Sequence, residues 1–226
     1  MVKKWILCTW ITGIFVLSVN GQDPLVGHWT FDETEGDTLY DETEYTNHGI
    51  HHGAKRITGI LGNALYLDGK TAFAELTGVD DGPPAILSEL GKGSISVWFK
   101  VDSIPTEYGI APIFYYGMEE HCDFFDAANQ GLIIELGHSP IFPGSKRLFF
   151  TIWNNGCTYP SFCFDTGFPV EEGKWHHFVA VVGEDYNTGY LDGEELVNRR
   201  YNFNNASASQ FFEDALAHEK LWIGKG

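Results

Sequence analysis

The sequence predicts an all-β protein, and its composition and patterning both point to that class. Aromatic residues make up 15% of the 226 residues, and there are 26 glycines. Aromatic residues favour strands, and glycine favours the turns between them. Short strand-like runs recur along the chain, whereas helix-like patterns are confined to 84–90 and 207–217. Many short strands with few helices are typical of a two-sheet antiparallel sandwich of the jelly-roll type.

The strand-like runs are spread over the chain from residue 25 onward. They cover 25–31, 63–67, 72–76, 94–101, 110–116, 131–136, 147–153, 175–182, 188–191, 194–199 and 221–224. Apolar and polar residues alternate over 94–101, which predicts a half-buried strand, with Ile95, Val97, Phe99 and Val101 on the buried face. The run 175–182 is apolar at nearly every position, as in a strand packed on both faces. The pairs Asp68-Gly69 and Asp192-Gly193 supply the positive φ that tight hairpin turns require.

Four tryptophans and two adjacent histidines lie in these runs. We expect the tryptophans to fill the space between the two sheets: Trp29, Trp98, Trp175 and Trp222. Adjacent strand residues point to opposite faces, so His176 and His177 cannot bind one metal ion together. We therefore interpret both histidines as structural.

The first 21 residues have the pattern of a secretory signal peptide. Lys3 and Lys4 precede an apolar run over 5–19, which is shorter than the roughly 20 residues of a membrane span. Val19 and Gly21 then place small residues at −3 and −1 of a cleavage site. We predict a mature domain over 22–226 that is secreted or held at the cell surface, with no membrane insertion after cleavage. An uncleaved anchor is the alternative.

The acidic balance of the chain limits its partners. The chain has 14 basic and 31 acidic residues, giving a formal net charge of −17. Nucleic acid and anionic lipid would be repelled by such a surface, so we expect neither as a partner.

Five segments, in this order, resemble the laminin-G-like branch of the concanavalin A-like lectins and glucanases. They are LVGHWTFDETEGDTLYD (25–41), GILGNALYLDG (59–69), SISVWFKVD (94–102), GKWHHFVAVV (173–182) with TGYLDGEELV (188–197), and LWIGKG (221–226). The resemblance implies a jelly-roll fold over nearly all of 22–226. Family members continue after the IG segment with a closing strand that carries an acidic pair. Because this sequence stops at Gly226, we expect the closing strand to be missing.

An acidic stretch suggests a calcium site. Seven carboxylates lie within the 13 residues of Asp32–Glu44, and calcium takes six to eight oxygen ligands in proteins. Members of the resembled family often hold a structural calcium near this loop, which implies calcium as a cofactor. Its expected ligands are Asp32, Asp41 and Asn47. A solvated acidic loop is the alternative.

No catalytic motif is found in the chain. Glycosidases place two carboxylates about 5–9.5 Å apart across the scissile bond, which on one strand requires positions i and i+2 or i and i+4. Glu135 is alone in its strand-like run, and Glu194 and Glu195 are adjacent, so they point to opposite faces. We expect a non-catalytic protein, with a polysaccharide-active enzyme as one alternative.

Two long loops, 117–130 and 154–174, carry the second feature of interest. If the runs 110–116, 131–136 and 147–153 are antiparallel neighbours, both loops lie at the same end of the sheet. Aromatic rings stack on sugars, and amides bind their hydroxyl groups. The expected ligand-binding residues are Tyr116, Trp153, Asn154 and Tyr159. We predict a carbohydrate-recognition or adhesion module of a larger extracellular protein, binding a glycan or polysaccharide. The alternative is a structural or protein-interaction domain, with a cell-surface protein as its partner.

Three cysteines remain after cleavage of the signal peptide, so one of them has no partner within the chain. Cys122 and Cys157 each follow a predicted strand at the same end of the sheet, and we expect them to form a disulfide. If 157–163 is extended, Cys157 and Cys163 are separated by about 20 Å, well beyond the roughly 7 Å between Cα atoms that a disulfide tolerates. Pro160 interrupts that segment, so a Cys157–Cys163 bond is the alternative.

Overall fold

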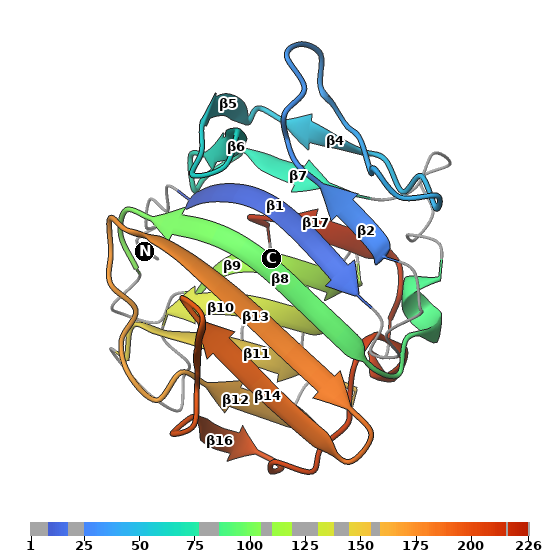
Figure 1. Cartoon of the computed structure of the whole chain (residues 1–226), viewed down its shortest axis with the longest axis vertical. Helices are drawn as coiled ribbons and strands as arrows, with labels where there is room; N and C mark the ends of the chain where they lie inside the picture. The colour runs from blue at the N-terminus through green and yellow to red at the C-terminus, as the bar shows by residue number, and fades with distance from the viewer. Residues whose placement is uncertain are drawn as a thin grey trace, which may run out of the picture.

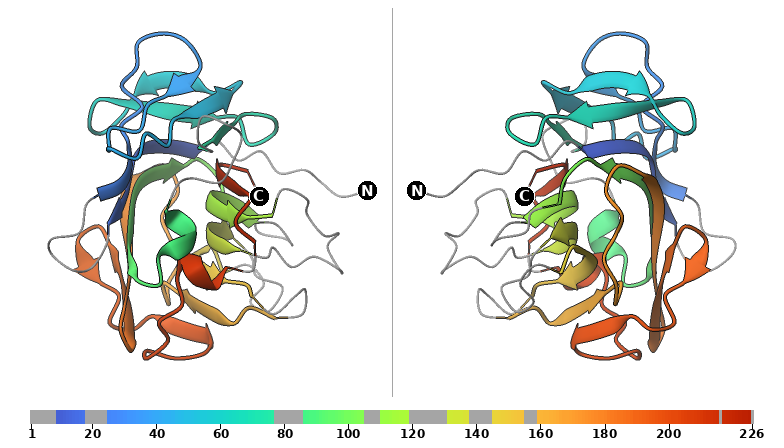
Figure 2. Two further views of the ribbon diagram at one scale, coloured as in Figure 1. Left: turned by 90° about the vertical axis from the view of Figure 1, so that its right-hand side faces the viewer. Right: turned by 90° about the vertical axis from the view of Figure 1, so that its left-hand side faces the viewer.

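Two antiparallel sheets packed face to face build the molecule, as the computed structural model shows (Figures 1 and 2). The structure describes residues 9–17, 25–76, 86–104, 110–118, 131–137, 145–154, 159–215 and 217–225. Within these ranges the helical segments are two short 3₁₀ turns, η1 (Leu87–Glu89) and η2 (Phe212–Asp214). The predicted all-β jelly-roll class is confirmed.

The first sheet has eight strands. Its order is β15 (Glu194–Glu195), β14 (Tyr186–Leu191), β13 (Trp175–Gly183), β8 (Gly93–Val101), β1 (Thr9–Leu17), β6 (Asn63–Leu67) and β5 (Lys55–Thr58), with β2 (Leu25–Trp29) also paired to β1. In Figure 1 this sheet faces the viewer over β1, β8, β13 and β14.

The second sheet has nine strands. Its order is β16 (Arg200–Phe203), β12 (Phe162–Asp165), β11 (Arg147–Ile152), β10 (Leu132–Gly137), β9 (Ile110–Gly117), β17 (Lys220–Ile223), β7 (Phe73–Glu75), β4 (Gly49–His52) and β3 (Thr38–Leu39). Strands β9 to β12 are consecutive antiparallel neighbours, so the predicted arrangement of 110–116, 131–136 and 147–153 is confirmed. The predicted loop 154–174 contains β12.

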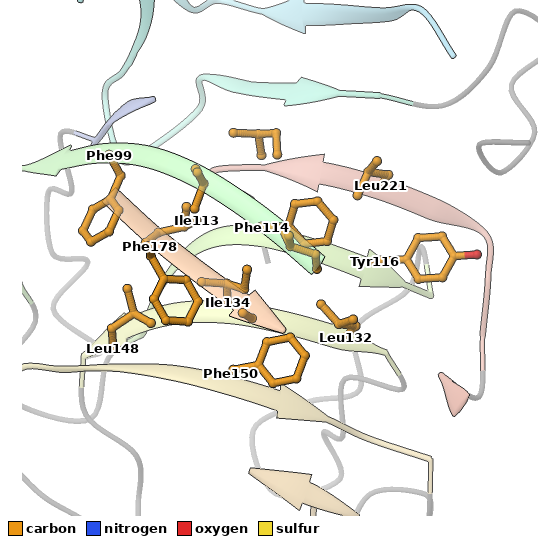
Figure 3. Close-up of a cluster of buried hydrophobic side chains, with 14 of the residues drawn as sticks. Phe99, Ile113, Phe114, Tyr116, Leu132, Ile134, Leu148, Phe150, Phe178 and Leu221 are labelled. Carbon is orange, nitrogen blue, oxygen red and sulfur yellow. The ribbon is translucent and has the colours of Figure 1, made fainter. Parts of the chain in front are cut away.

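The main core lies between the sheets and is built by alternating residues of their strands (Figure 3). Ile95, Val97, Phe99 and Val101 of β8 are fully buried in it, as their alternation with polar residues predicts. Phe114, Leu132 and Phe150 face them from the second sheet. Fully burying side chains of this size contributes about 1.5–3 kcal/mol each relative to leaving them exposed.

Some expectations are wrong in detail. In β13 only alternate residues such as Phe178, Ala180 and Val182 are fully buried, so this strand packs on one face. Trp29 fills the inter-sheet core, but Trp98 and Trp175 are only half-buried. Both side chains lie on the outer face of the first sheet, away from the core, where only neighbouring side chains of the same sheet cover them. Trp98, for example, stacks on His177 with ring centroids 4.7 Å apart.

The two Asp-Gly pairs behave differently. Asp192 and Gly193 both have positive φ, 55° and 86°, in the β14–β15 hairpin. Asp68-Gly69 instead connects β6 of the first sheet to β7 of the second. The Asp68 carboxylate accepts backbone hydrogen bonds from Lys70, Thr71 and Ala72, each at 2.9 Å. These bonds hold its pKa far below the usual range.

Residues 9–17, within the predicted signal peptide, form strand β1 between β8 and β6. No helix in the described ranges is long and apolar enough to cross a membrane.

Candidate ligand-binding face

The outer face of the nine-stranded sheet carries an aromatic cluster separate from the main core. Cys163, Thr151, Ile133, Tyr115 and Trp222 are paired in sequence across β12, β11, β10, β9 and β17. Directly paired residues share a face of a sheet. Tyr115 and Trp222 stack with ring centroids 5.5 Å apart, and this cluster lies on the opposite side of the sheet from Phe114 and Phe150.

Trp153 extends this cluster at the end of β11. Its backbone N–H donates to the Gly131 carbonyl at 2.8 Å, and its half-buried ring packs against the Tyr115–Trp222 cluster. Tyr159 lies across the β11–β12 hairpin, 58% exposed, with its ring 5.8 Å from that of Phe203. Asn154 is half-buried. Trp153, Asn154 and Tyr159 therefore lie at one end of the sheet, as predicted. We call Trp153, Asn154, Tyr159, Asn202 and Phe203 the rim patch.

A buried polar network centred on Asp165 lies on the same face of the sheet, further along β12 from the rim patch. The Asp165 side chain is fully buried and accepts from Arg147 Nη1 at 3.3 Å, Asn202 Nδ2 at 3.0 Å and the Gly167 N–H at 2.7 Å. Three buried polar atoms of this region have no hydrogen-bond partner in the structure: Trp153 Nε1, Arg147 Nε and Asn202 Oδ1. Leaving such a group unpaired costs about 1–3 kcal/mol, and because all three atoms are buried, a ligand or water reaches them only when the side chains that cover them move.

Glu135 and Asp165 lie in one row across the sheet, with Phe149 between them. Phe149 on β11 pairs with Glu135 on β10 and with Asp165 on β12, so about 10 Å separate the two backbones. Phe149 is almost completely buried on the same face and stands between the carboxylates. Desolvation by the surrounding protein raises the pKa of Glu135 to about 7.

Tyr116 does not belong to the rim patch. It lies in the core between the sheets, where its ring is 5.0 Å from that of Phe212 and its hydroxyl is 3.1 Å from His218 Nδ1 (Figure 3). Successive strand residues face opposite sides, so when Tyr115 joins the outer cluster Tyr116 must turn inward.

Cys163 lies in the same outer face as a free, buried thiol. Thr151 Oγ1 lies 3.4 Å from its sulfur, and burial raises the pKa of the thiol to about 12. The Cys157–Cys163 alternative is therefore not formed in this structure. Cys122 and Cys157 lie outside the described residues, so their pairing stays a prediction.

In the acidic stretch, Asp41 is used by the loop itself. One carboxylate oxygen accepts from the N–H groups of His28 and Thr43, and the other from Thr43 Oγ1 and the Asn47 N–H, all within 3.0 Å. Asp32 is exposed and accepts from the Asn63 N–H at 2.6 Å. Within the described ranges, His, Cys, Asp and Glu side chains form no group of three or more that could hold a metal ion.

The two adjacent histidines contact opposite faces, as predicted. His176 is buried, with Nδ1 2.8 Å from Asp192 Oδ2 and Nε2 2.9 Å from the Glu171 carbonyl oxygen. His177 Nε2 lies 2.7 Å from Ser96 Oγ on the outer side of the first sheet. Both histidines pin neighbouring segments of the first sheet to one another.

A shallow hollow of about 450 Å³ lies elsewhere, beside η1 and η2. Glu89, Lys92, Glu184 and Glu213 line it together with Ser209 and small or apolar residues, without an aromatic ring. It therefore lacks the stacking surface that a sugar uses.

Sequence reasoning missed Arg147, Asp165 and Asn202. They lie on three different strands, β11, β12 and β16, and meet only when these strands pair. An extended segment over 157–163 was considered only in weighing the cysteine pairings, and β16 lies outside the predicted strand-like runs.

The fold and this face define a jelly-roll sandwich with an aromatic and polar surface on one sheet. A family model for the concanavalin A-like lectin/glucanases superfamily matches residues 64–216. The chain belongs to this superfamily. No curated protein sequence is significantly similar to it.

Comparison with solved structures finds weak similarities, all with TM-scores below 0.5. Domain 4 of AbnA, a GH43 extracellular arabinanase from Geobacillus stearothermophilus solved with arabinotriose, is 17% identical, with 89% of this chain and 92% of that chain covered and a TM-score of 0.47. A Trypanosoma rangeli sialidase in complex with sialic acid is 14% identical, with 96% and 28% covered and a TM-score of 0.46. The carbohydrate binding module CBM66 from Bacillus subtilis is 11% identical, with 77% and 90% covered and a TM-score of 0.26.

Proposed function

We propose that this chain is a carbohydrate-recognition module of a secreted or cell-surface protein, and that its ligand lies on the rim patch. The observation that carries the proposal is the exposed ring of Tyr159, supported by Phe203, at the same end of the sheet as Trp153 and a buried polar network with unpaired atoms. Membership of a superfamily of lectins and glucanases supports the same class of ligand.

The rim patch offers both kinds of contact that a sugar needs. The face of the Tyr159 ring, supported by Phe203, can lie against the C–H groups of a pyranose or furanose ring. The Trp153 indole N–H is a donor and the Asn202 Oδ1 an acceptor, and a sugar hydroxyl bonds to each of them if the side chains that cover these buried atoms move on binding. Both atoms are without a partner in the structure.

We propose binding without catalysis. Phe149 stands between the carboxylates of Glu135 and Asp165, which leaves no room there for a glycosidic bond. Asp165 is also held by Arg147 and Asn202. An assay for reducing ends and unsaturated products on any bound polysaccharide tests this point, and turnover lost in Glu135→Gln would contradict it.

The experiment that tests the proposal is a glycan array with the secreted protein, followed by titration of the best glycan. We expect Tyr159→Ala to weaken binding at least tenfold while its urea unfolding curve stays unchanged. The matched control is Tyr186→Ala, an exposed tyrosine on β14 of the other sheet, which should bind as the unmodified chain does. Equal effects of the two substitutions would refute the rim patch. The absence of any glycan ligand would favour the alternative of a protein-interaction or structural domain.

A further inference from the structure

The rim patch is built from two stretches of the chain that carry no charge. Its members belong to 148–164, on β11 and β12, and to 201–212, on and after β16, and neither stretch contains Asp, Glu, Lys, Arg or His. In the chain as a whole, charged residues make up 20% of the sequence. Because β11, β12 and β16 are neighbours in the second sheet (Figure 1), the two uncharged stretches come together there.

Burial does not account for the lack of charge in the second stretch. Asn202 and Phe203 are half-buried, and the residues from Asn204 to Ser207 are exposed. Lys, Glu, Arg and Asp are common at such positions, yet here every side chain is uncharged. The Asn204 amide donates to the Ser161 carbonyl at 3.4 Å, so neutral polar groups continue from β16 to the chain beside Tyr159. The surface around the Tyr159 ring is therefore polar but uncharged.

The cations nearest to the patch are compensated or lie further along β16. Arg147 and Asp165 approach each other to 3.3 Å, and the Asp165 side chain is fully buried, so Arg147 has its counter-ion inside the protein. Arg200 is exposed and pairs in register with Asp165. It lies three positions before Phe203, which is about 10 Å along a strand, whereas physiological salt screens exposed charges over about 8 Å. An acidic group on a sugar at Tyr159 therefore finds no neighbouring cation among the residues that the structure describes.

The charge of the chain around this neutral surface is negative. The formal net charge is −17. The segment 118–130 starts and ends at the end of the sheet where Trp153 lies, since the Trp153 N–H donates to the carbonyl of Gly131 at the start of β10. That segment contains neither Lys nor Arg, and its acidic residues are Glu119, Glu120, Asp123 and Asp126. A glycan with carboxylate or sulfate groups therefore meets like charge and gains no ion pair in return.

We propose that the rim patch selects uncharged glycans and rejects glycans that carry carboxylate or sulfate groups. This inference rests on the proposed function and specifies the class of its ligand. An uncharged sugar needs only a ring face and neutral hydrogen-bonding groups, and the patch supplies both. Salt screens interactions between charges, so the affinity for such a ligand should not depend on ionic strength.

The test compares matched glycans on the unmodified protein. The array carries neutral glucans, galactans, xylans and arabinans together with polyuronates and sulfated galactans. The uncharged glycan that binds most tightly is then compared with its own form oxidised at C6 to the carboxylate. We expect the carboxylate form to bind at least tenfold more weakly in 0.1 M NaCl. Its methyl ester has the added atoms without the charge, and should bind within threefold of the parent glycan.

Salt separates charge from shape in the same comparison. In 1 M NaCl the screening length falls to about 3 Å. The carboxylate form should then recover part of its affinity, while the affinity for the uncharged glycan should change by less than twofold.

A lysine placed beside the patch should weaken the selection. Asn204→Lys should raise the affinity for the carboxylate form at least fivefold and leave the affinity for the uncharged glycan within twofold. The matched control is Asn198→Lys, the same replacement at an exposed asparagine before the start of β16, which should change neither affinity. Asn204 has a φ of 64°, where lysine is strained, so urea unfolding is measured for both variants. Asn204→Gly, which fits this φ, gives the effect of losing the amide alone.

The outcomes that overturn the inference differ from those that overturn the proposed function. If the tightest ligand is an acidic glycan and Tyr159→Ala abolishes its binding, the rim patch remains the site and its selection for uncharged ligands is refuted. Equal affinities for the carboxylate form and its methyl ester refute the selection as well. Should Asn204→Lys fail to fold, the comparison of matched glycans on the unmodified protein decides. A chain that binds no glycan on the array loses the proposed function and this inference together.

Discussion

Replacing Asp41 with asparagine should destabilise the domain whether or not calcium is present. The Asp41 carboxylate accepts four hydrogen bonds, from the N–H groups of His28, Thr43 and Asn47 and from Thr43 Oγ1. In Asp41→Asn one oxygen becomes an NH₂ group, which faces donors and leaves at least one backbone N–H unpaired. Asp41 is 4% exposed, so water cannot replace the lost acceptor.

The loss can be estimated from these contacts. A hydrogen bond to a charged group contributes about 1.5–3 kcal/mol, and the Thr43 hydroxyl can rotate to a new partner. We therefore expect the free energy of unfolding to fall by about 2 kcal/mol, and Tm by about 4–8 °C for a domain of this size. Urea unfolding is measured in EDTA and in calcium. The control is Asp37→Asn, whose side chain is 77% exposed and should change stability by less than about 0.5 kcal/mol. A loss seen only in calcium would make Asp41 a metal ligand and refute this reasoning.

Three further predictions concern calcium, Glu135 and the cysteines. If the predicted calcium site exists, calcium at about ten times its dissociation constant adds roughly 1.4 kcal/mol, and melts in calcium and EDTA should differ by a few degrees; superimposable melts would contradict it. Desolvation raises the pKa of Glu135 to about 7, so the folded state holds a proton that the unfolded state has released. The free energy of unfolding should therefore fall by up to about 3 kcal/mol between pH 4.5 and 7. In Glu135→Gln this contribution should vanish, and an unchanged pH profile in urea titrations would contradict the burial argument. The Cys163 thiol, with its pKa raised to about 12, should react with thiol reagents only after unfolding, and peptide mapping without reductant should recover Cys122 linked to Cys157. Recovery of three free thiols would contradict that pairing.

The sequence predicted the long, alternating strands because burial of one face leaves a period of two in the chain. This holds for β8, whereas β9 to β11 are buried on both faces and were predicted as nearly continuous apolar runs. The edge strands β3, β5 and β16 gave little signal. Short strands at an edge bury few side chains and are often polar. Their existence depends on the neighbours that they pair with.

The candidate site was predicted in part. Trp153, Asn154 and Tyr159 could be placed together because consecutive antiparallel strands bring their ends to one edge of a sheet. Tyr116 was expected on the ligand-binding face but lies in the core. The face on which a strand residue lies depends on the strand register, and the bulge between Ile134 and Glu135 in the β9–β10 pairing changes that register. The Asp165 network was invisible in the sequence because its members come from three strands.

The most direct test of the account follows the indole N–H signals of the tryptophans by NMR while the glycan selected on the array is added. Trp153 Nε1 has no partner in the structure, so its N–H resonance should shift on binding, in step with the Tyr159 ring signals. Trp98, on the outer side of the first sheet and stacked on His177, should not move. Binding that shifts Trp98 or the residues around the hollow at Glu89, with Trp153 unchanged, would contradict the account.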